Sequence, residues 1–332
     1  MATAEQLDEP EPIEQRPLRT VDHSDVAAGP GEVLIEVGAC AVCRTDLQIV
    51  EGDLPARRLP IIPGHQVVGC IREVGEGVAD RFIGQRVGVG WLAGTCGVCG
   101  FCRTERENLC EQATFTGWDR PGGYSDLITA RADFTYLLPE TKSDEDLAPL
   151  LCGGVIGYRA LRLAGIQAGG RLGLFGFGAS ALLVIQVATY WDCEVYVATR
   201  SETEQQRALD LGAVWAGSYE DDIPAPLEAA ITFAPVGDVV IAALRSLDRG
   251  GTVAINAIHL DRVPEFPYEL LWWERQLRSV SNFTRRDAEE FLALADEIPI
   301  RTVIDGYPLA DANEALAELK HGRVNGAAVL SP

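Results

Sequence analysis

The chain has 332 residues, 47% of them hydrophobic, which is enough for two domains with substantial cores. Its formal net charge of −21 would repel a phosphate backbone, so nucleic acid is excluded as an expected partner. We expect a soluble cytoplasmic protein, because no apolar run is long enough to span a bilayer and the acidic, proline-rich N-terminus is unlike a signal peptide. Nine cysteines without a secretion signal indicate thiolate chemistry or bound metal.

The first predicted elements are a loose arm to about Pro30 and a strand in EVLIEVGA. CAVCRTDL follows and places Cys43 ahead of a polar run, and PGHQVVG then supplies His65. Alone, a cysteine is usually a small buried residue and a histidine is more often structural than a ligand. Cys152 in LLCGG favours a ligand role for both residues. Two cysteines and one histidine form a zinc site with a vacant fourth position, which is typical of catalytic zinc.

A second cysteine cluster lies between His65 and Cys152, in the run CGVCGFCRTERENLC. Four thiolates close a tetrahedral shell and leave no position for a substrate. An iron–sulfur cluster is the weaker alternative, since the bacterial ferredoxin run has a shorter last gap followed by proline. We therefore predict a structural zinc lobe over about residues 94–112, held by Cys96, Cys99, Cys102 and Cys110.

A dinucleotide site is predicted at GFGASA, which follows the strand-like RLGLF and opens an amphipathic helix. Gly176, Gly178 and Ala181 are the small residues of a GxGxxG/A turn, and the N–H groups of the helix would point at the pyrophosphate. RLGLF, EVYVAT, AVWAGS, AAITFA and TVAINA alternate with helical patterns, which favours an α/β fold with a doubly wound parallel sheet. The expected cofactor-binding residues are Gly176, Phe177, Gly178, Ala179, Ser180, Thr199, Arg200, Ser201 and Asn256.

The choice between NAD and NADP depends on the end of the second strand, VATRSE. NAD enzymes usually place an acidic residue there to bind the ribose hydroxyls. Thr199 followed by Arg200 suits a 2′-phosphate instead, so NADP is favoured. NAD stays open, because Glu202 and Glu204 are close and Arg200 could be a solvated loop residue.

These motifs, in this order, resemble the zinc-dependent medium-chain alcohol dehydrogenase family, and most of all its bacterial members near the cinnamyl alcohol dehydrogenase type. The resemblance rests on GHQVVGCIREVGEGV, the four-cysteine lobe, GGY at Gly122–Tyr124, LLCGG and TRRD at Thr284–Asp287. It implies a GroES-like, β-rich catalytic domain over residues 1–150 and 285–332, with a Rossmann domain inserted over 151–284. It also implies a homo-oligomer, either a dimer or a tetramer.

The resemblance further implies roles for individual residues. Thr45 would take the alcohol proton, Asp46 would bind the second nitrogen of His65, and Arg44 and Arg285 would pair with the pyrophosphate. Each has a plainer alternative, namely a helix cap, a first-turn charge or a solvated arginine. The implied substrate is a primary alcohol or aldehyde in a pocket lined by Trp91 and Trp118, although core packing would explain a tryptophan equally well.

Two departures from the family pattern leave a second function open. Gln66 stands where a glutamate is usual, and Gln48 stands where many relatives have a proton-relaying histidine. Because an amide does not titrate near pH 7, proton release would proceed through water or cofactor hydroxyls. The favoured function is a zinc-dependent alcohol dehydrogenase or aldehyde reductase using NAD(P)(H). The alternative is a catalytically impaired protein of the same fold, while a zinc-free quinone reductase is disfavoured by the three catalytic ligands.

Overall fold

The computed structural model describes residues 1–257, 260 and 262–332. The chain forms two compact units. The first unit comprises Met1–Cys152, Asn282–Asp296 and Arg301–Pro332, and the second comprises Gly153–Ser281 and Glu297–Ile300. The C-terminal segment thus returns to the unit that contains the N-terminus.

A seven-stranded sheet forms the centre of the first unit, with strand order β16-β17-β3-β4-β5-β9 and β8 paired to β3. Alternating apolar residues build it, since Val33, Ile35 and Val37 of β3 are all buried. Its strands are β3 (Glu32–Ala41), β4 (Val67–Val74), β5 (Arg86–Val89), β8 (Leu127–Arg131), β9 (Thr135–Leu137), β16 (Ile304–Pro308) and β17 (Ala327–Ser331). The helices of this unit are α1 (Arg44–Glu51), α2 (Asp144–Leu147), α7 (Arg285–Glu297) and α8 (Ala312–Lys320), and a small sheet pairs β6 (Leu92–Gly94) with β7 (Thr114–Phe115).

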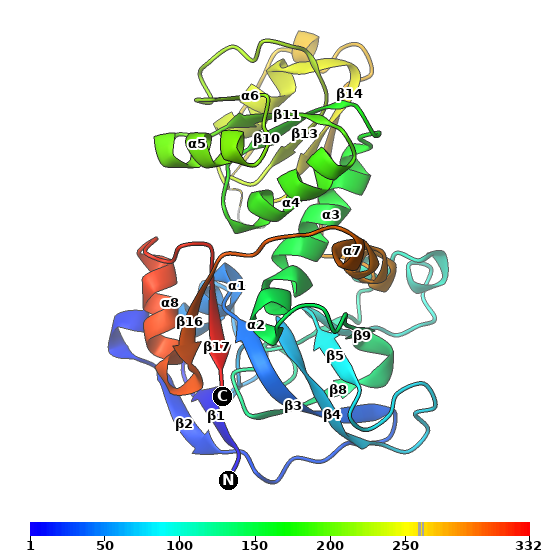
Figure 1. Cartoon of the computed structure of the whole chain (residues 1–332), viewed down its shortest axis with the longest axis vertical. Coiled ribbons are helices and arrows are strands. Elements are labelled where there is room, and N and C mark those ends of the chain that lie inside the picture. Colours follow the sequence, from blue (N-terminus) through cyan, green and yellow to red (C-terminus); the bar gives the residue numbers. More distant parts are fainter. Residues whose placement is uncertain (258–259, 261) are drawn as a thin grey trace. The chain divides into compact units, whose positions relative to one another are not determined.

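The N-terminal segment is not a loose arm, so that prediction is wrong. β1 (Thr3–Leu7) and β2 (Leu18–Asp22) pair as antiparallel strands, shown in dark blue in Figure 1. Ala4 and Leu7 are fully buried and form single bridges to Ser125 and Ile61. The polar, acidic sequence of this segment favoured an exposed arm, but even Glu5 is buried. Its carboxylate accepts a hydrogen bond from the Thr20 hydroxyl.

The second unit is built on a six-stranded parallel sheet in the order β12-β11-β10-β13-β14-β15, which is the Rossmann arrangement. Of these strands, Figure 1 labels β10, β11, β13 and β14. Five strands match the predicted apolar runs: β10 (Arg171–Phe175), β11 (Glu194–Ala198), β12 (Trp215–Gly217), β13 (Leu227–Thr232) and β14 (Leu247–Ile255). The polar edge strand β15 (Gln276–Ser279) was not predicted, because its sequence QLRS has no apolar alternation. The helices are α3 (Gly153–Ala164), α4 (Ala179–Tyr190), α5 (Glu202–Asp210) and α6 (Gly237–Arg245).

Among the described helices, none is by itself both long and apolar enough to cross a membrane. One neighbouring pair, Asp144–Leu151 with Gly153–Ala164, passes the same test of length and composition when taken together.

Candidate metal centres

Cys43, His65 and Cys152 come together in the first unit, with their ligand atoms all within 4.8 Å of one another. Cys43 is the N-cap of α1, His65 follows Gly64 in a left-handed turn, and Cys152 directly follows the turn Ala148–Leu151. Two sulfurs and one imidazole fit zinc, and among the described residues the group contains no fourth ligand. The donor set therefore suits an open zinc site.

Asp46 orients this site from a fully buried position. Its Oδ1 lies 2.8 Å from Nδ1 of His65, and its Oδ2 accepts a hydrogen bond from the Cys43 N–H at 2.8 Å. Because Nδ1 carries the proton toward the carboxylate, Nε2 is left as the nitrogen for a metal. Asp46 at the third position of α1 also closes a capping box with Cys43, so the helix start and the metal site depend on the same carboxylate.

Of the two thiols in the metal-free site, Cys43 loses its proton more readily. The pKa of its thiol is lowered well below the usual value by a hydrogen bond from Cys152 and, against the effect of burial, by His65. The pKa of the Cys152 thiol is raised by the same hydrogen bond and by burial. Burial lowers the pKa of His65, but Asp46 and Cys43 raise it to about 10. Zinc must therefore displace protons to bind, so its affinity falls as pH falls.

Asp46→Asn is expected to weaken zinc binding at this site roughly 10–100-fold, the usual effect of removing a group that orients a metal-bound histidine. An amide brings two donors of its own to a position where three N–H donors already converge. Zinc affinity measured by chelator competition tests this, with Asp53→Asn on an exposed turn as the control. Unchanged affinity in Asp46→Asn would contradict the role assigned to the carboxylate.

The second centre contains four cysteines, Cys96, Cys99, Cys102 and Cys110, whose sulfurs also lie within 4.8 Å of one another. Individual Sγ···Sγ distances are 3.5 Å for Cys99–Cys102, 3.6 Å for Cys96–Cys110 and 3.9 Å for Cys96–Cys102. A tetrahedron with Zn–S bonds of about 2.3 Å requires sulfurs about 3.8 Å apart. The backbone N–H groups of Cys99 and Cys102 point at the sulfurs of Cys96 and Cys99, which stabilises thiolates. This donor set fits a closed, structural zinc.

The four-cysteine lobe is joined to the start of α7 by ion pairs. The buried Glu107 carboxylate accepts hydrogen bonds from the backbone N–H and the Nε of Arg285, at 3.0 and 3.4 Å. Arg286 pairs with Glu105 at 3.2 Å. Glu107 was not selected from the sequence, because a carboxylate among the charged residues of a lobe is ordinarily solvated.

Of the two tryptophans expected at a substrate pocket, Trp91 contacts the His65 ring and Trp118 packs on Trp91. Trp91 meets the imidazole edge to face at 4.9 Å, and Trp118 stacks on Trp91 at 5.8 Å. Phe115 extends this aromatic stack, and the Arg57 guanidinium lies 3.8 Å from the centre of the Trp118 ring. Arg57 was not selected from the sequence, since only the tertiary structure places its loop over the tryptophan.

The glycine turn of the second unit has the geometry that a dinucleotide needs. Gly176 has φ of +91° at the end of β10, and a Cβ there would lie 3.0 Å from the backbone nitrogen of Ala234. Gly178 is the N-cap of α4, Ala179 and Ser180 form its first turn, and Phe177 is buried. The reversal of strand order falls between β10 and β13, where α/β sheets bind ligands.

The remaining cofactor candidates occupy the ends of the parallel strands. Thr199 follows β11, and its hydroxyl donates to the Glu204 carboxylate. Ser201 caps α5, whereas Arg200 is exposed. Asn256 follows β14 and its N–H donates to the Thr232 carbonyl at 2.9 Å. Thr232 was missed by the sequence analysis, although its hydroxyl is fully buried and has no hydrogen-bond partner in the described part of the chain.

The first turn of α1 and the TRRD segment carry the other candidates. Thr45 is half-buried, two positions from Cys43, and Arg44 is exposed. Arg285 is held by Glu107, so it is not simply a solvated arginine.

The two glutamines that depart from the family pattern are not exposed. Gln66 is buried and donates through Nε2 to the Ala41 carbonyl at 3.2 Å, and Gln48 is half-buried in α1. Three further thiols lie outside both ligand groups: Cys40 and Cys193 are buried, and Cys70 in β4 is half-buried.

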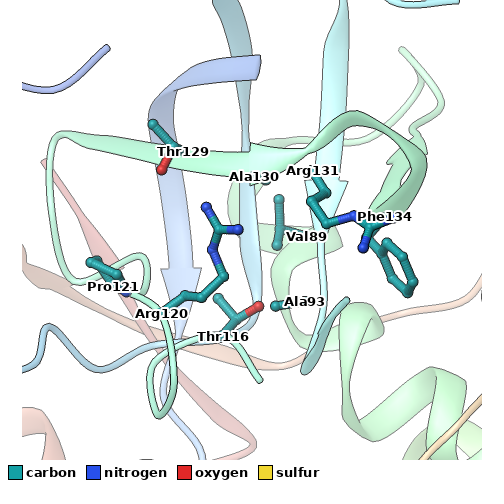
Figure 2. A pocket seen from close by; sticks show the side chains of 9 residues that line it. All are labelled: Val89, Ala93, Thr116, Arg120, Pro121, Thr129, Ala130, Arg131 and Phe134. Carbon is teal, nitrogen blue, oxygen red and sulfur yellow. The ribbon is translucent and has the colours of Figure 1, made fainter. Parts of the chain in front are cut away.

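A small cavity of the first unit lies apart from these ligand sets (Figure 2). Val89, Ala93 and Ala130 form its apolar part, and the Arg120 and Arg131 side chains extend along it. Both guanidinium groups are paired with carboxylates, Arg120 with Glu32 and Arg131 with Asp133. Among the described residues that line the cavity, neither arginine is therefore an unpaired charge for a ligand.

Comparison with known proteins gives concordant matches. Residues 29–140 match the family described as the alcohol dehydrogenase GroES-like domain. A probable alcohol dehydrogenase, AdhA of Mycobacterium tuberculosis (strain CDC 1551 / Oshkosh), is 48% identical over 99% of this chain and 96% of its own length. An alcohol dehydrogenase of Geobacillus stearothermophilus is 30% identical over 95% of this chain and 96% of its own length. The solved cinnamyl alcohol dehydrogenase SbCAD4 of Sorghum bicolor has a TM-score of 0.90 and 25% identity, covering 100% of this chain and 98% of that chain.

Proposed function

This chain belongs to the zinc-dependent medium-chain alcohol dehydrogenase family, and we propose that it transfers hydride between NADP(H) and a primary alcohol or aldehyde. It is an NAD(P)-dependent alcohol dehydrogenase and aldehyde reductase with a Cys–His–Cys catalytic zinc site and a four-cysteine structural zinc site. The observation that carries the proposal is the convergence of Cys43, His65 and Cys152 without a fourth protein ligand among the described residues. Zinc bound there supplies a Lewis acid that lowers the pKa of an alcohol or polarises a carbonyl.

The chain's own residues hold the groups around the reacting atoms. We assign Thr45 to take the alcohol proton, because it lies two residues after the ligand Cys43, within the first turn of α1. Asp46 keeps His65 in the tautomer that binds metal through Nε2. With Gln48 in place of a histidine, the proton leaves through water or cofactor hydroxyls, so no pKa near 6.5 arises from this position.

The substrate assignment rests on the aromatic stack beside His65. Trp91 and Trp118 form a flat apolar wall, which suits an aliphatic or aromatic primary alcohol or aldehyde. We assign the catalytic domain to residues 1–150 and 285–332 and the coenzyme domain to residues 151–284. In the coenzyme domain, Gly176 to Ser180 would hold the pyrophosphate by backbone N–H groups. The family resemblance further assigns Arg44 and Arg285, which belong to the catalytic domain, to pairing with the pyrophosphate.

The NADP assignment rests on Arg200 beside the neutral Thr199. NAD is the second candidate, because the hydroxyl of Thr199 binds the Glu204 carboxylate, which brings an acidic group to the position where ribose hydroxyls would be recognised. If NADP is the cofactor, wild-type kcat/KM is higher with NADPH than with NADH. If NAD is the cofactor, NADH is preferred and Glu204→Gln removes that preference.

Arg200→Ala is expected to lower kcat/KM for NADPH about 10-fold to 100-fold and to leave kcat/KM for NADH unchanged. A hydrogen bond to a charged group contributes about 1.5–3 kcal/mol, and about 1.4 kcal/mol corresponds to a factor of ten. Steady-state kinetics with both cofactors and an aldehyde such as benzaldehyde measure this, with Arg245→Ala at the end of α6 as an exposed control. An equal loss with both cofactors would contradict a role for Arg200 in binding the 2′-phosphate.

The alternative of an impaired enzyme rests on Gln66 and Gln48, and the Gln66 amide is bound to the Ala41 carbonyl. Two zincs per chain with no turnover on a panel of aldehydes, restored by Gln66→Glu, would support it. We propose in addition a cytoplasmic location and a homo-oligomer, either a dimer or a tetramer. The exposed Trp272 and Trp273 of the second unit suit a subunit contact, and light scattering of the purified enzyme distinguishes these states from a monomer.

A further inference from the structure

The Asp46 carboxylate has a fourth donor that no part of the proposed reaction uses, the hydroxyl of Tyr124. The O–H donates to Oδ2 at 3.2 Å, and both side chains are fully buried. The other donors are Nδ1 of His65 and the N–H groups of Cys43 and Gly64. A phenol hydroxyl at this position satisfies a buried lone pair that water cannot reach.

Tyr124 also lies against the segment that carries His65. Its backbone N–H donates to the Pro63 carbonyl at 3.0 Å, and the N–H of Gly123 donates to the Gly64 carbonyl at 2.9 Å. A Cβ on Gly64 would lie 2.4 Å from the Tyr124 ring, so the ring packs directly on that glycine. The turn before His65 is therefore held by Tyr124 through both its backbone and its side chain.

We propose that Tyr124 is a positioning residue of the catalytic zinc site, which acts by holding Asp46 in the orientation that aligns His65. Without the phenol, Oδ2 keeps only the Cys43 N–H, and the carboxylate can rotate away from Nδ1. The imidazole then loses its fixed direction, and zinc leaves more readily. This inference rests on the proposed zinc site, and wild-type protein with fewer than two zincs per chain would show that the site, rather than the role of Tyr124, is at fault.

The test is zinc release from Tyr124→Phe holoenzyme in excess chelator, resolved into two phases for the two centres. We expect the phase of the Cys43, His65 and Cys152 site to be about threefold to tenfold faster, below the 10–100-fold typical of direct partners of a metal-bound histidine. The four-cysteine phase should be unchanged, which makes it an internal standard. Cobalt substituted at the open site should give an altered visible absorption spectrum in the variant.

Tyr136→Phe is the matched control, because Tyr136 is equally buried and its hydroxyl has no hydrogen-bond partner within the part of the chain that the structure describes. It should release both zincs at the wild-type rates. In an Asp46→Asn background, Tyr124→Phe should cause a smaller change, since an amide keeps only one of the two acceptor oxygens of the carboxylate.

Three results would overturn the proposal. These are a wild-type release rate in Tyr124→Phe, faster release from both centres together, and an undiminished effect in the Asp46→Asn background. If Tyr124→Phe does not fold, a fluorinated tyrosine incorporated at position 124 retains the shape of the ring and makes the hydroxyl a stronger donor. Release from the open site should then be slower, and an unchanged rate would equally overturn the proposal.

Discussion

Cys152→Ser is expected to lower kcat/KM by about 10³-fold and to reduce the zinc content from two ions per chain to one. Cys152 supplies one of the three ligands of the open site, and serine is a poor zinc ligand at neutral pH. A Lewis-acid zinc stabilises the transition state by several kcal/mol, and about 4 kcal/mol corresponds to about 10³-fold. Metal analysis and steady-state aldehyde reduction, measured on the same preparation, test both parts.

Cys70→Ser is the control for this substitution, because Cys70 is a half-buried thiol of the same unit and lies outside both ligand groups. It should retain two zincs and wild-type activity. Full activity of Cys152→Ser with a single zinc would mean that the reaction does not use this site. Retention of both zincs in Cys152→Ser would mean that the sulfur is not a ligand.

Cys102→Ser is expected to release the other zinc and to destabilise the first unit by roughly 3 kcal/mol, since structural zinc contributes directly to folding. The lobe has little else to hold it, because its core consists of Leu92, Cys110, Ala113 and Phe134 with partly buried cysteines and Phe115 around them. For a unit of this size the midpoint of thermal unfolding should fall by about 6–12 °C. Calorimetry and zinc analysis measure the two effects, and a variant with the wild-type midpoint would contradict a structural role.

In the zinc-free lobe, the cysteines are expected to react with an alkylating reagent in a definite order, because their thiols differ in pKa. Backbone N–H groups lower the pKa of Cys96 to about 6, whereas burial raises the pKa of Cys110 to about 11. At pH 7 Cys96 is then a thiolate and Cys110 a thiol, so iodoacetamide should modify Cys96 first. Below about pH 6 the Cys96 thiolate is protonated and its reaction should slow. Peptide mapping by mass spectrometry reads the order, and earlier modification of Cys110 would contradict it.

The α/β fold class and the family were predicted correctly from the sequence, because their signals are local. Strands β10, β11, β13 and β14 of the parallel sheet each contain a run of buried, mostly apolar residues, and the glycine turn lies directly between β10 and α4. The edge strand β15 and the pair β1 and β2 were missed. Their side chains are polar or mixed, so only pairing with neighbouring strands makes these segments regular.

The sequence by itself determined which residue types were available for two metal centres. The four closely spaced cysteines indicate a metal site, because a disulfide framework is not expected in such a chain. Only the tertiary structure decided how the distant residues meet. It brings Cys43, His65 and Cys152 within 4.8 Å of one another and places Tyr124 on the Asp46 carboxylate. The physical reason is that a buried carboxylate must accept hydrogen bonds, and the donors to Asp46 come from several segments of the chain. No spacing along the sequence encodes that convergence.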